Sequence, residues 1–169
     1  MKKLFLLSAM ALTGFGIMAQ QDKSKRPSPP ANVSETTEKG VTITIDYSQP
    51  SVKGRTIGKD IAPYGKVWRT GANEPTTIEV SKDVQVEGQH LPAGKYSLYS
   101  IPGADEWTII INKKTTGWGT QYDESQDALR IKVKPGKAPQ FTEKMTFTIS
   151  KSGTVSLLWG NEKVDFNVI

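Results

Sequence analysis

Hydrophobic and polar residues alternate through most of the chain after residue 40. In the first such segment, Val41, Ile43 and Ile45 share one face of an extended strand, and the residues between them are polar. Similar segments follow, separated by glycine and proline turn signals, at residues 76–80, 84–86, 96–101, 107–112, 129–133, 145–149, 155–159 and 164–168. The pattern predicts roughly eight to ten antiparallel strands, each with one buried face and one wet face.

These strands predict an all-β class, namely an antiparallel β-sandwich or a jelly-roll-like single domain spanning residues 32–169. Turn signals recur at the short intervals typical of such folds, and two of the turns are expected at residues 87–90 and 160–161. Beyond the N-terminus, only residues 123–128 fit even a short helical turn. A length of about 140 residues suits one domain with a hydrophobic core.

The N-terminus has the features of an export signal. Two lysines follow the initial methionine, residues 4–18 are apolar but too few for a comfortable transmembrane span, and Ala19 suits cleavage. We therefore assign residues 1–19 to a helical signal peptide and residues 20–31, which include KRPSPP, to a flexible linker. The protein is expected in the periplasm or outside the cell, with no transmembrane span in the mature chain. The alternative is an uncleaved N-terminal anchor.

Composition excludes several classes of protein. The chain has no cysteine, so a bacterial lipoprotein anchor, a disulfide framework and thiolate metal sites are excluded. Removal of the two N-terminal lysines from 22 basic residues leaves 20 against 17 acidic residues, a net charge of +3. Because the charges are dispersed rather than gathered in a basic face, nucleic acid is not an expected partner.

Two segments lack the strand pattern and are too long for turns, namely residues 49–75 and 113–127. Long loops on a compact β domain usually carry function or move, and we expect these two to lie near each other. They are rich in arginine, tryptophan and other side chains suited to binding. The predicted ligand-binding residues in and beside them are Tyr47, Arg55, Trp68, Arg69, Asn73, Glu74 and Trp118.

Each of these side chains also has a structural interpretation. Arg55 and Arg69 offer planar forks for a carboxylate or phosphate, but they could equally pin the loop through ion pairs with Glu74 or Asp46. Arg69 and Glu74 flank a turn at Gly71, so we expect them to couple through an ion pair or a shared ligand.

The tryptophans are open to similar alternatives. Trp68 suits either stacking on a sugar ring or packing within the protein. Trp118 lies between two glycines and is expected to be exposed. Trp107 and Trp159 fall in strand patterns and are expected in the core.

Catalytic chemistry has weaker support than binding. His90 is the single histidine and falls in an expected turn, and no GxSxG elbow is present, which disfavours a catalytic triad and catalytic zinc. A glycosidase-type pair of carboxylates is an open alternative, with Glu74 next to one of the acids Asp46, Asp60, Glu124 or Asp127. Each acid could instead be a surface charge. No phosphate loop or calcium loop is present, and no metal or cofactor is predicted.

Four stretches of the sequence together resemble a known bacterial family. They are YSQPSVKGR, PYGKVWRTGANE, LPAGKYSLYSIPG and the GWG of residues 117–119. The chain is similar through them, from about residue 29 to the C-terminus, to the family called domain of unknown function 2911. The resemblance implies an exported single-domain protein and marks five hallmark positions, Arg55, Trp68, Arg69, Asn73 and Glu74. It implies no reaction.

The favoured hypothesis is a binding module in which the two loops form one polar and aromatic pocket for a small polar ligand or glycan. The alternatives are a carboxylate-based hydrolase that uses Glu74 and a structural envelope domain in which the loop residues only pin the loop. Binding requires exposed tryptophan and free arginine donors. Hydrolysis requires a second acid near Glu74, and a structural role requires Arg69 and Glu74 to be buried and paired. Catalysis is less favoured than binding, and the sequence indicates no oligomeric state.

Overall fold

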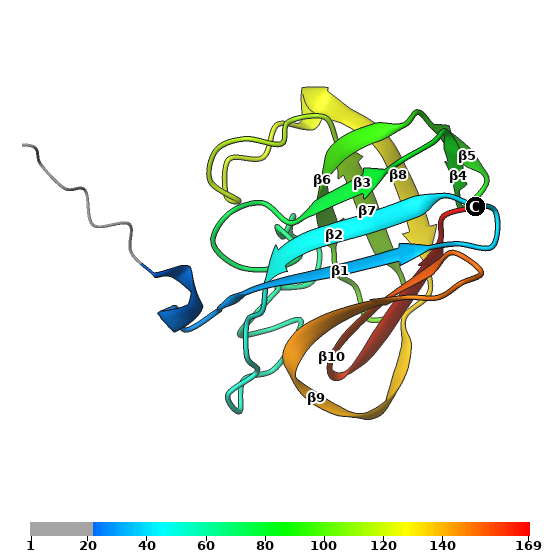
Figure 1. The fold of residues 1–169 in the computed structure, drawn as a ribbon. Helices are drawn as coiled ribbons and strands as arrows, with labels where there is room; N and C mark the ends of the chain where they lie inside the picture. The colour runs from blue at the N-terminus through cyan, green and yellow to red at the C-terminus, as the bar shows by residue number, and fades with distance from the viewer. Residues whose placement is uncertain (1–21) are drawn as a thin grey trace, which may run out of the picture.

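The computed structural model describes residues 22–169, and these form an antiparallel β fold (Figure 1). Helical structure in this range is limited to two three-residue 3₁₀ turns, η1 (Lys23–Lys25) and η2 (Glu124–Gln126). The expected all-β class is therefore confirmed, and so is the short helical turn after residue 123. The signal peptide assigned to residues 1–19 lies outside the described residues. No helix within residues 22–169 is long and apolar enough to cross a membrane.

The larger layer is an open six-stranded sheet in which every neighbouring pair is antiparallel. Its strands, in spatial order, are β1 (Pro30–Thr36), β2 (Thr42–Ser48), β3 (Thr77–Val80), β6 (Gly94–Ile101), β7 (Trp107–Asn112) and β8 (Asp127–Val133). The first strand begins at Pro30, inside the segment that the sequence assigned to a linker.

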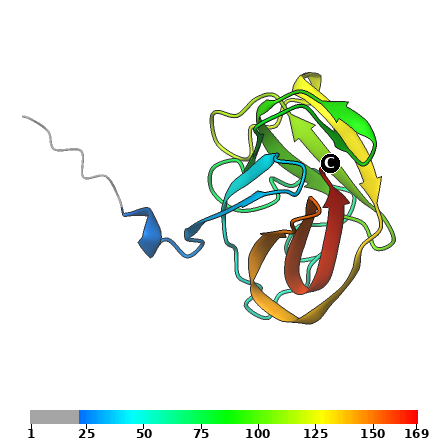
Figure 2. The same ribbon diagram turned by 45° about the vertical axis from the view of Figure 1, so that its right-hand side comes forward.

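A long hairpin forms the second layer, from β9 (Gly136–Ile149) and β10 (Thr154–Asn167). A small hairpin of β4 (Val84–Val86) and β5 (Gln89–Leu91) joins it through a bridge between Val86 and Val168. Figures 1 and 2 show the long hairpin at the bottom of the molecule, while the 113–127 loop lies at the upper left in both views.

The core lies between the sheet and the long hairpin. Alternate residues of the sheet strands face it, as the periodicity predicts, and Ile45, Ile78 and Ile111 are completely buried there. The hairpin contributes Met145 and Phe166. Burial of each such side chain stabilises the fold by about 1.5–3 kcal/mol.

Two expected turns differ from the structure. The chain does not turn at Gly160 but continues through it within β10, where the register with β9 shifts on both sides of this residue. Gly160 has a φ of 58°, so a bulge replaces the turn. The turn expected over residues 87–90 is only Glu87 and Gly88, because Gln89 already pairs with Val86 as part of β5.

Part of the outer face of the sheet is covered by a loop, whereas the alternation predicted an outer face that is exposed to solvent throughout. Tyr99 on β6 pairs with Ile110 on β7, and both side chains are at most 2% exposed although they face away from the core cluster. Residue Tyr122 of the 113–127 loop packs on Tyr99 with ring centroids 4.9 Å apart. The loop therefore lies over this part of the outer face.

Candidate functional site

The first long loop is fixed to the edge of β6 beyond the end of β3. Trp68 and Ser100 form a two-way backbone bridge, with N–H to O distances of 2.7 and 2.9 Å. Thr70 donates its hydroxyl to Ser100 Oγ at 2.9 Å and accepts the hydroxyl of Thr76 at its own carbonyl, also at 2.9 Å. These buried bonds hold residues 68–76 in a defined turn, so the side chains that follow Trp68 have fixed directions.

The two long loops meet at Gly119, as the sequence led us to expect. Its N–H donates to the carbonyl of Asn73 at 3.1 Å. A Cβ on Gly119 would lie 2.5 Å from Arg69 Cδ and 2.8 Å from Asn73 O, distances that real Cβ contacts do not reach. The close approach therefore depends on glycine at this position.

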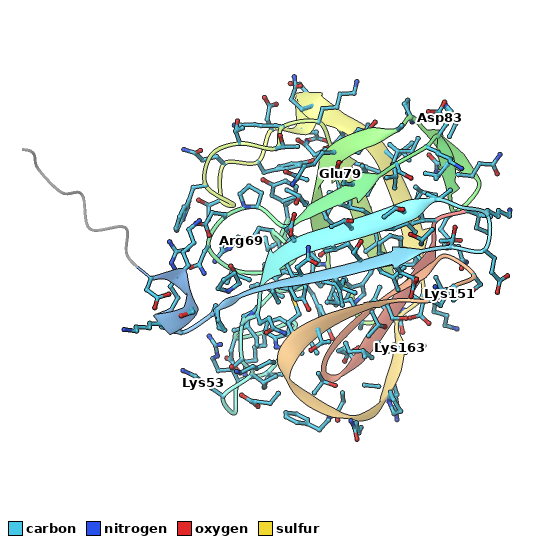
Figure 3. The ribbon with its side chains drawn as sticks, viewed as in Figure 1. Lys53, Arg69, Glu79, Asp83, Lys151 and Lys163 are labelled. Atoms are coloured by element: carbon cyan, nitrogen blue, oxygen red, sulfur yellow. The ribbon has the colours of Figure 1, made fainter. Side chains whose placement is uncertain are left out.

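The contact between the loops encloses a hollow of about 370 Å³, which we call the Arg69 pocket. Trp68 and Arg69 come from the first loop, Tyr99 from β6 and Tyr122 from the second loop. The complete lining is Val67, Trp68, Arg69, Tyr99, Gly119, Thr120 and Tyr122. In Figure 3, Arg69 lies at the end of the sheet nearest the N-terminal 3₁₀ turn, far from Lys163 on the long hairpin.

Arg69 has no counter-charge in the described part of the chain. Its Nε is buried and makes no hydrogen bond, and its guanidinium forms no ion pair with any acid of residues 22–169. Buried donors are nearly always paired in folded proteins, and an unpaired one carries a desolvation penalty. An unpaired guanidinium at a pocket wall is the arrangement that a ligand with acceptor oxygens would complete.

Tyr99 is the second donor without a partner. The residue is 2% exposed, yet its hydroxyl makes no hydrogen bond within residues 22–169. Burial raises the pKa of Tyr99, and the positive charge of Arg69 acts in the opposite direction, which places the guanidinium within electrostatic range of the phenol. At neutral pH the hydroxyl is protonated and able to donate.

Tyr122, in contrast, is held by a polar network behind the pocket. Its hydroxyl donates to Asp127 Oδ2 and accepts from Arg130 Nη2, both at 2.7 Å. Burial, followed by the bond to Asp127, raises the pKa of Tyr122 to about 12. Arg130 is further paired with Glu124 at 2.9 Å. The ring of Tyr122 is consequently a fixed wall of the pocket, and its hydroxyl is occupied.

Trp68 packs within the protein, which is the second of its two sequence interpretations. Its ring stacks on Trp159 with centroids 5.2 Å apart and planes 9° apart, and it meets Trp107 edge-on at 6.3 Å. Trp107 and Trp159 are both buried, as predicted. Trp68 is only partly buried and also lines the Arg69 pocket. Its contacts with Trp107 and Trp159 hold the ring in place, so it forms a rigid wall of the pocket.

Glu74 does not pair with Arg69, and the expected direct ion pair is wrong. The Glu74 carboxylate instead contacts Lys23 Nζ at 3.0 Å and receives Arg26 Nη1 at 2.9 Å on both oxygens. Partial burial would raise the pKa of Glu74, but hydrogen bonds from its own backbone, Arg26 and Lys23 outweigh this and lower the pKa to about 2. Asp46, the other suggested arginine partner, contacts Asn32 and Lys95.

The remaining candidates lie outside the Arg69 pocket. Tyr47 is buried, packs edge-on against Phe147 at 5.0 Å and accepts the N–H of that residue. Together with Glu74 it lines a separate groove of about 410 Å³ beside β1 and β2. Arg55 donates to the carbonyls of Ser51 and Val52, at 2.7 and 3.1 Å.

Asn73 and Trp118 complete the set. Asn73 adopts a φ of 61° and donates its amide to the carbonyl of Ser28 at 3.0 Å. Trp118 is 49% exposed, as expected from its flanking glycines, and does not line the pocket. The seven candidates therefore do not converge on one pocket, and only Trp68 and Arg69 of the seven line the hollow between the two loops.

Sequence reasoning missed Tyr99 and Tyr122. Tyr99 falls on the strand face that a simple alternation assigns to solvent. A large aromatic residue at such a position indicates that another segment covers this face of the strand, and this was the signal that could have identified Tyr99. Tyr122 stands five residues before Asp127 in a loop without periodicity, so no pattern could place its ring against β6.

Other reactive groups form no site in the described range. The His90 side chain on β5 is 66% exposed and lies 3.9 Å from Asp83, the residue before β4, consistent with a surface histidine. Residues 22–169 contain no group of three or more histidine, aspartate or glutamate side chains that could hold a metal ion.

The family comparison agrees with the resemblance seen in the sequence. The family model described as "Protein of unknown function (DUF2911)" matches residues 28–168. The chain belongs to this family. The DUF2911 match contains every residue that lines the Arg69 pocket, whereas Lys23 and Arg26, the partners of Glu74, precede it. Neither the curated proteins nor the solved structures give a significant match to this chain.

Proposed function

We propose that this DUF2911 protein is an exported binding module that takes a small polar ligand or glycan in the Arg69 pocket. The observation that carries the proposal is the pair of unpartnered donors, Arg69 and the Tyr99 hydroxyl, in a hollow walled by Trp68 and Tyr122. A volume of about 370 Å³ falls within the usual range for ligand pockets, and a few polar groups among aromatic walls are their usual lining.

A purely structural role for the loop residues fits Glu74 better than it fits Arg69. Glu74 ties the N-terminal segment to the loop through Lys23 and Arg26. Arg69 would need an acid partner for the same role, and no described acid contacts it. Arg69 and Glu74, which were expected to act together, therefore have different proposed roles. Glu74 is structural, and Arg69 binds the ligand.

Hydrolysis through Glu74 has little geometric support. With a pKa of about 2, Glu74 is ionised at neutral pH and has no proton to donate as a general acid. As a base or nucleophile it would first have to give up two cationic partners. Binding is therefore favoured over catalysis.

The test is a ligand screen monitored by nuclear magnetic resonance on the mature protein. Mixtures of simple saccharides, amino acids, amines and organic acids are added while the Trp68 indole and the Gly119 and Thr120 amides are followed. We expect at least one class to shift these signals with saturation, and to leave the signals of Lys53 and Glu79, which lie outside the pocket, unchanged. A screen in which no compound moves the pocket signals would contradict the proposed function.

A further inference from the structure

We propose that the ligand of the Arg69 pocket is a small organic acid. Its negatively charged oxygens would pair with the Arg69 guanidinium and the Tyr99 hydroxyl, and its flat or cyclic body would lie against Trp68 and Tyr122. This inference rests on the proposed function and assigns the chemical class of the ligand.

The charge of the pocket is the first reason. Arg69 is the one charged side chain among the described residues that line the hollow. The acids nearest in sequence to the lining already have partners. Glu74 is paired with Lys23 and Arg26, and Asp123 accepts the N–H and hydroxyl of Ser125. Glu124 and Asp127 are both paired with Arg130. The pocket thus carries a positive charge without a protein counter-ion, and an anion is the complementary ligand.

The geometry of the donors is the second reason. A guanidinium presents a planar fork that matches two oxygens of a carboxylate or phosphate. Tyr99 adds a hydroxyl that is nearly excluded from solvent and is protonated at neutral pH. The Arg69 guanidinium pairs with no acid in the described range, so an oxyanion would supply a counter-charge that residues 22–169 do not provide.

The walls are the third reason, and they argue against a free inorganic ion. Trp68, held flat by Trp159, and Tyr122, held by Asp127 and Arg130, present fixed aromatic surface. Inorganic anions are usually held by several backbone N–H groups, as in nests and phosphate loops, whereas this hollow is lined mainly by side chains, several of them aromatic. A ring attached to the anion would occupy that surface.

The third wall, Gly119, keeps Arg69 in place. A side chain on Gly119 would displace the Arg69 Cδ, because its Cβ would come within 2.5 Å of that atom. Glycine here lets the second loop lie directly on the arginine stem, which restricts the positions that the stem can take.

The test compares matched ligands that differ in charge or in the ring. Benzoate and benzamide have the same ring but differ in charge, as do glucuronate and glucose. Phenyl phosphate and inorganic phosphate share a charged group but differ in the ring. The readout is the Nε–Hε resonance of Arg69, which is observable because this group is shielded from water, together with the Trp68 indole.

We expect the charged member of each ring pair to bind at least about tenfold more tightly than the neutral one, and phenyl phosphate to bind more tightly than inorganic phosphate. The tightest binder among benzoate, glucuronate and phenyl phosphate then indicates whether the ligand class is an aromatic acid, a sugar acid or a phosphate ester. Arg69→Met should remove the preference for charge. Arg69→Lys should retain part of it, and Tyr99→Phe should weaken benzoate binding several-fold.

Arg55→Met is the matched control, because Arg55 belongs to the same loop but donates to backbone carbonyls outside the pocket. It should leave all affinities unchanged. Equal binding of benzoate and benzamide, or of glucuronate and glucose, would overturn the organic-acid inference while leaving the binding module intact. Tighter binding of inorganic phosphate than of phenyl phosphate would overturn the role of the aromatic walls. Absence of any shift with all six compounds and in the wider screen would remove both proposals.

Discussion

Gly119 donates its backbone N–H to the carbonyl of Asn73 at 3.1 Å, and through this bond two loops more than forty positions apart in the sequence become one surface. The bond lies directly beside Arg69, whose stem occupies the space that a side chain at Gly119 would need. The pocket therefore depends on the contact between the loops as much as on the side chains that line it.

Replacement of Gly119 by alanine should destabilise the protein by about 1–3 kcal/mol, because the new methyl group overpacks against Arg69 and the Asn73 carbonyl. Urea denaturation measures the change. Gly136→Ala is the control, since a Cβ there meets only the Lys163 carbonyl at 3.8 Å, and it should change stability by less than about 0.5 kcal/mol. Equal effects of the two substitutions would show that the loops do not pack as described.

Tyr99 and Tyr122, whose rings are in contact, should respond differently to loss of their hydroxyls. Tyr122→Phe removes a partly buried hydrogen-bond partner of Asp127 and Arg130, and we expect it to destabilise the protein by about 1–3 kcal/mol. Tyr99→Phe removes a hydroxyl that has no partner in the described chain, so stability should stay within about 0.5 kcal/mol or rise. Thermal and urea denaturation of the two variants make the comparison. A large loss for Tyr99→Phe would mean that its hydroxyl is already bonded.

The Glu74 ion pairs should make stability depend on acid pH. The pKa of Glu74 falls from its ordinary 4.5 to about 2 on folding, so its contribution is complete above pH 4.5 and is lost as pH falls toward 2. Because the side chain is 38% exposed, solvent screening reduces the contribution to about 1 kcal/mol.

Glu74→Gln should therefore lower stability at pH 6 and converge with the parent protein near pH 2. Urea denaturation at several pH values checks this, with the exposed Glu79→Gln as a control that should follow the parent throughout. A constant difference between Glu74→Gln and the parent from pH 6 to pH 2 would contradict the assigned ionisation.

Export is a separate prediction from the N-terminal sequence. Mass spectrometry of the protein recovered from its native cell should show a chain that begins near Gln20, because Ala19 ends the apolar run. A chain that retains Met1 in the envelope fraction would indicate the anchored alternative.

Strand positions were the most predictable part of the fold, since alternation is read directly from side chains such as Ile43 and Ile45. Gly160 shows the limit of that reasoning. Glycine permits both a turn and a bulge, and the choice depends on whether the next segment continues to pair with β9, which is a tertiary property.

The candidate site was predictable as a region but not as a set of contacts. The 49–75 loop was marked by its residue types, and Arg69 and Trp68 do line a pocket there. The expected Arg69–Glu74 pair failed because Arg26, forty-eight residues earlier, satisfies Glu74 instead. Long-range partners of this kind leave no periodic trace in the sequence, and the same is true of Tyr99, which becomes a pocket wall only when a distant loop covers its strand.

The most direct measurement is a crystal structure of the mature protein grown with benzoate, glucuronate or phenyl phosphate. The account predicts density for the acid between the Arg69 guanidinium and the Tyr99 hydroxyl, with its ring on Trp68 and with hydrogen-bond distances of about 2.7–3.0 Å to both donors. An Arg69 side chain paired with a carboxylate of its own chain, or an acid bound only in the separate groove beside Glu74, would contradict it.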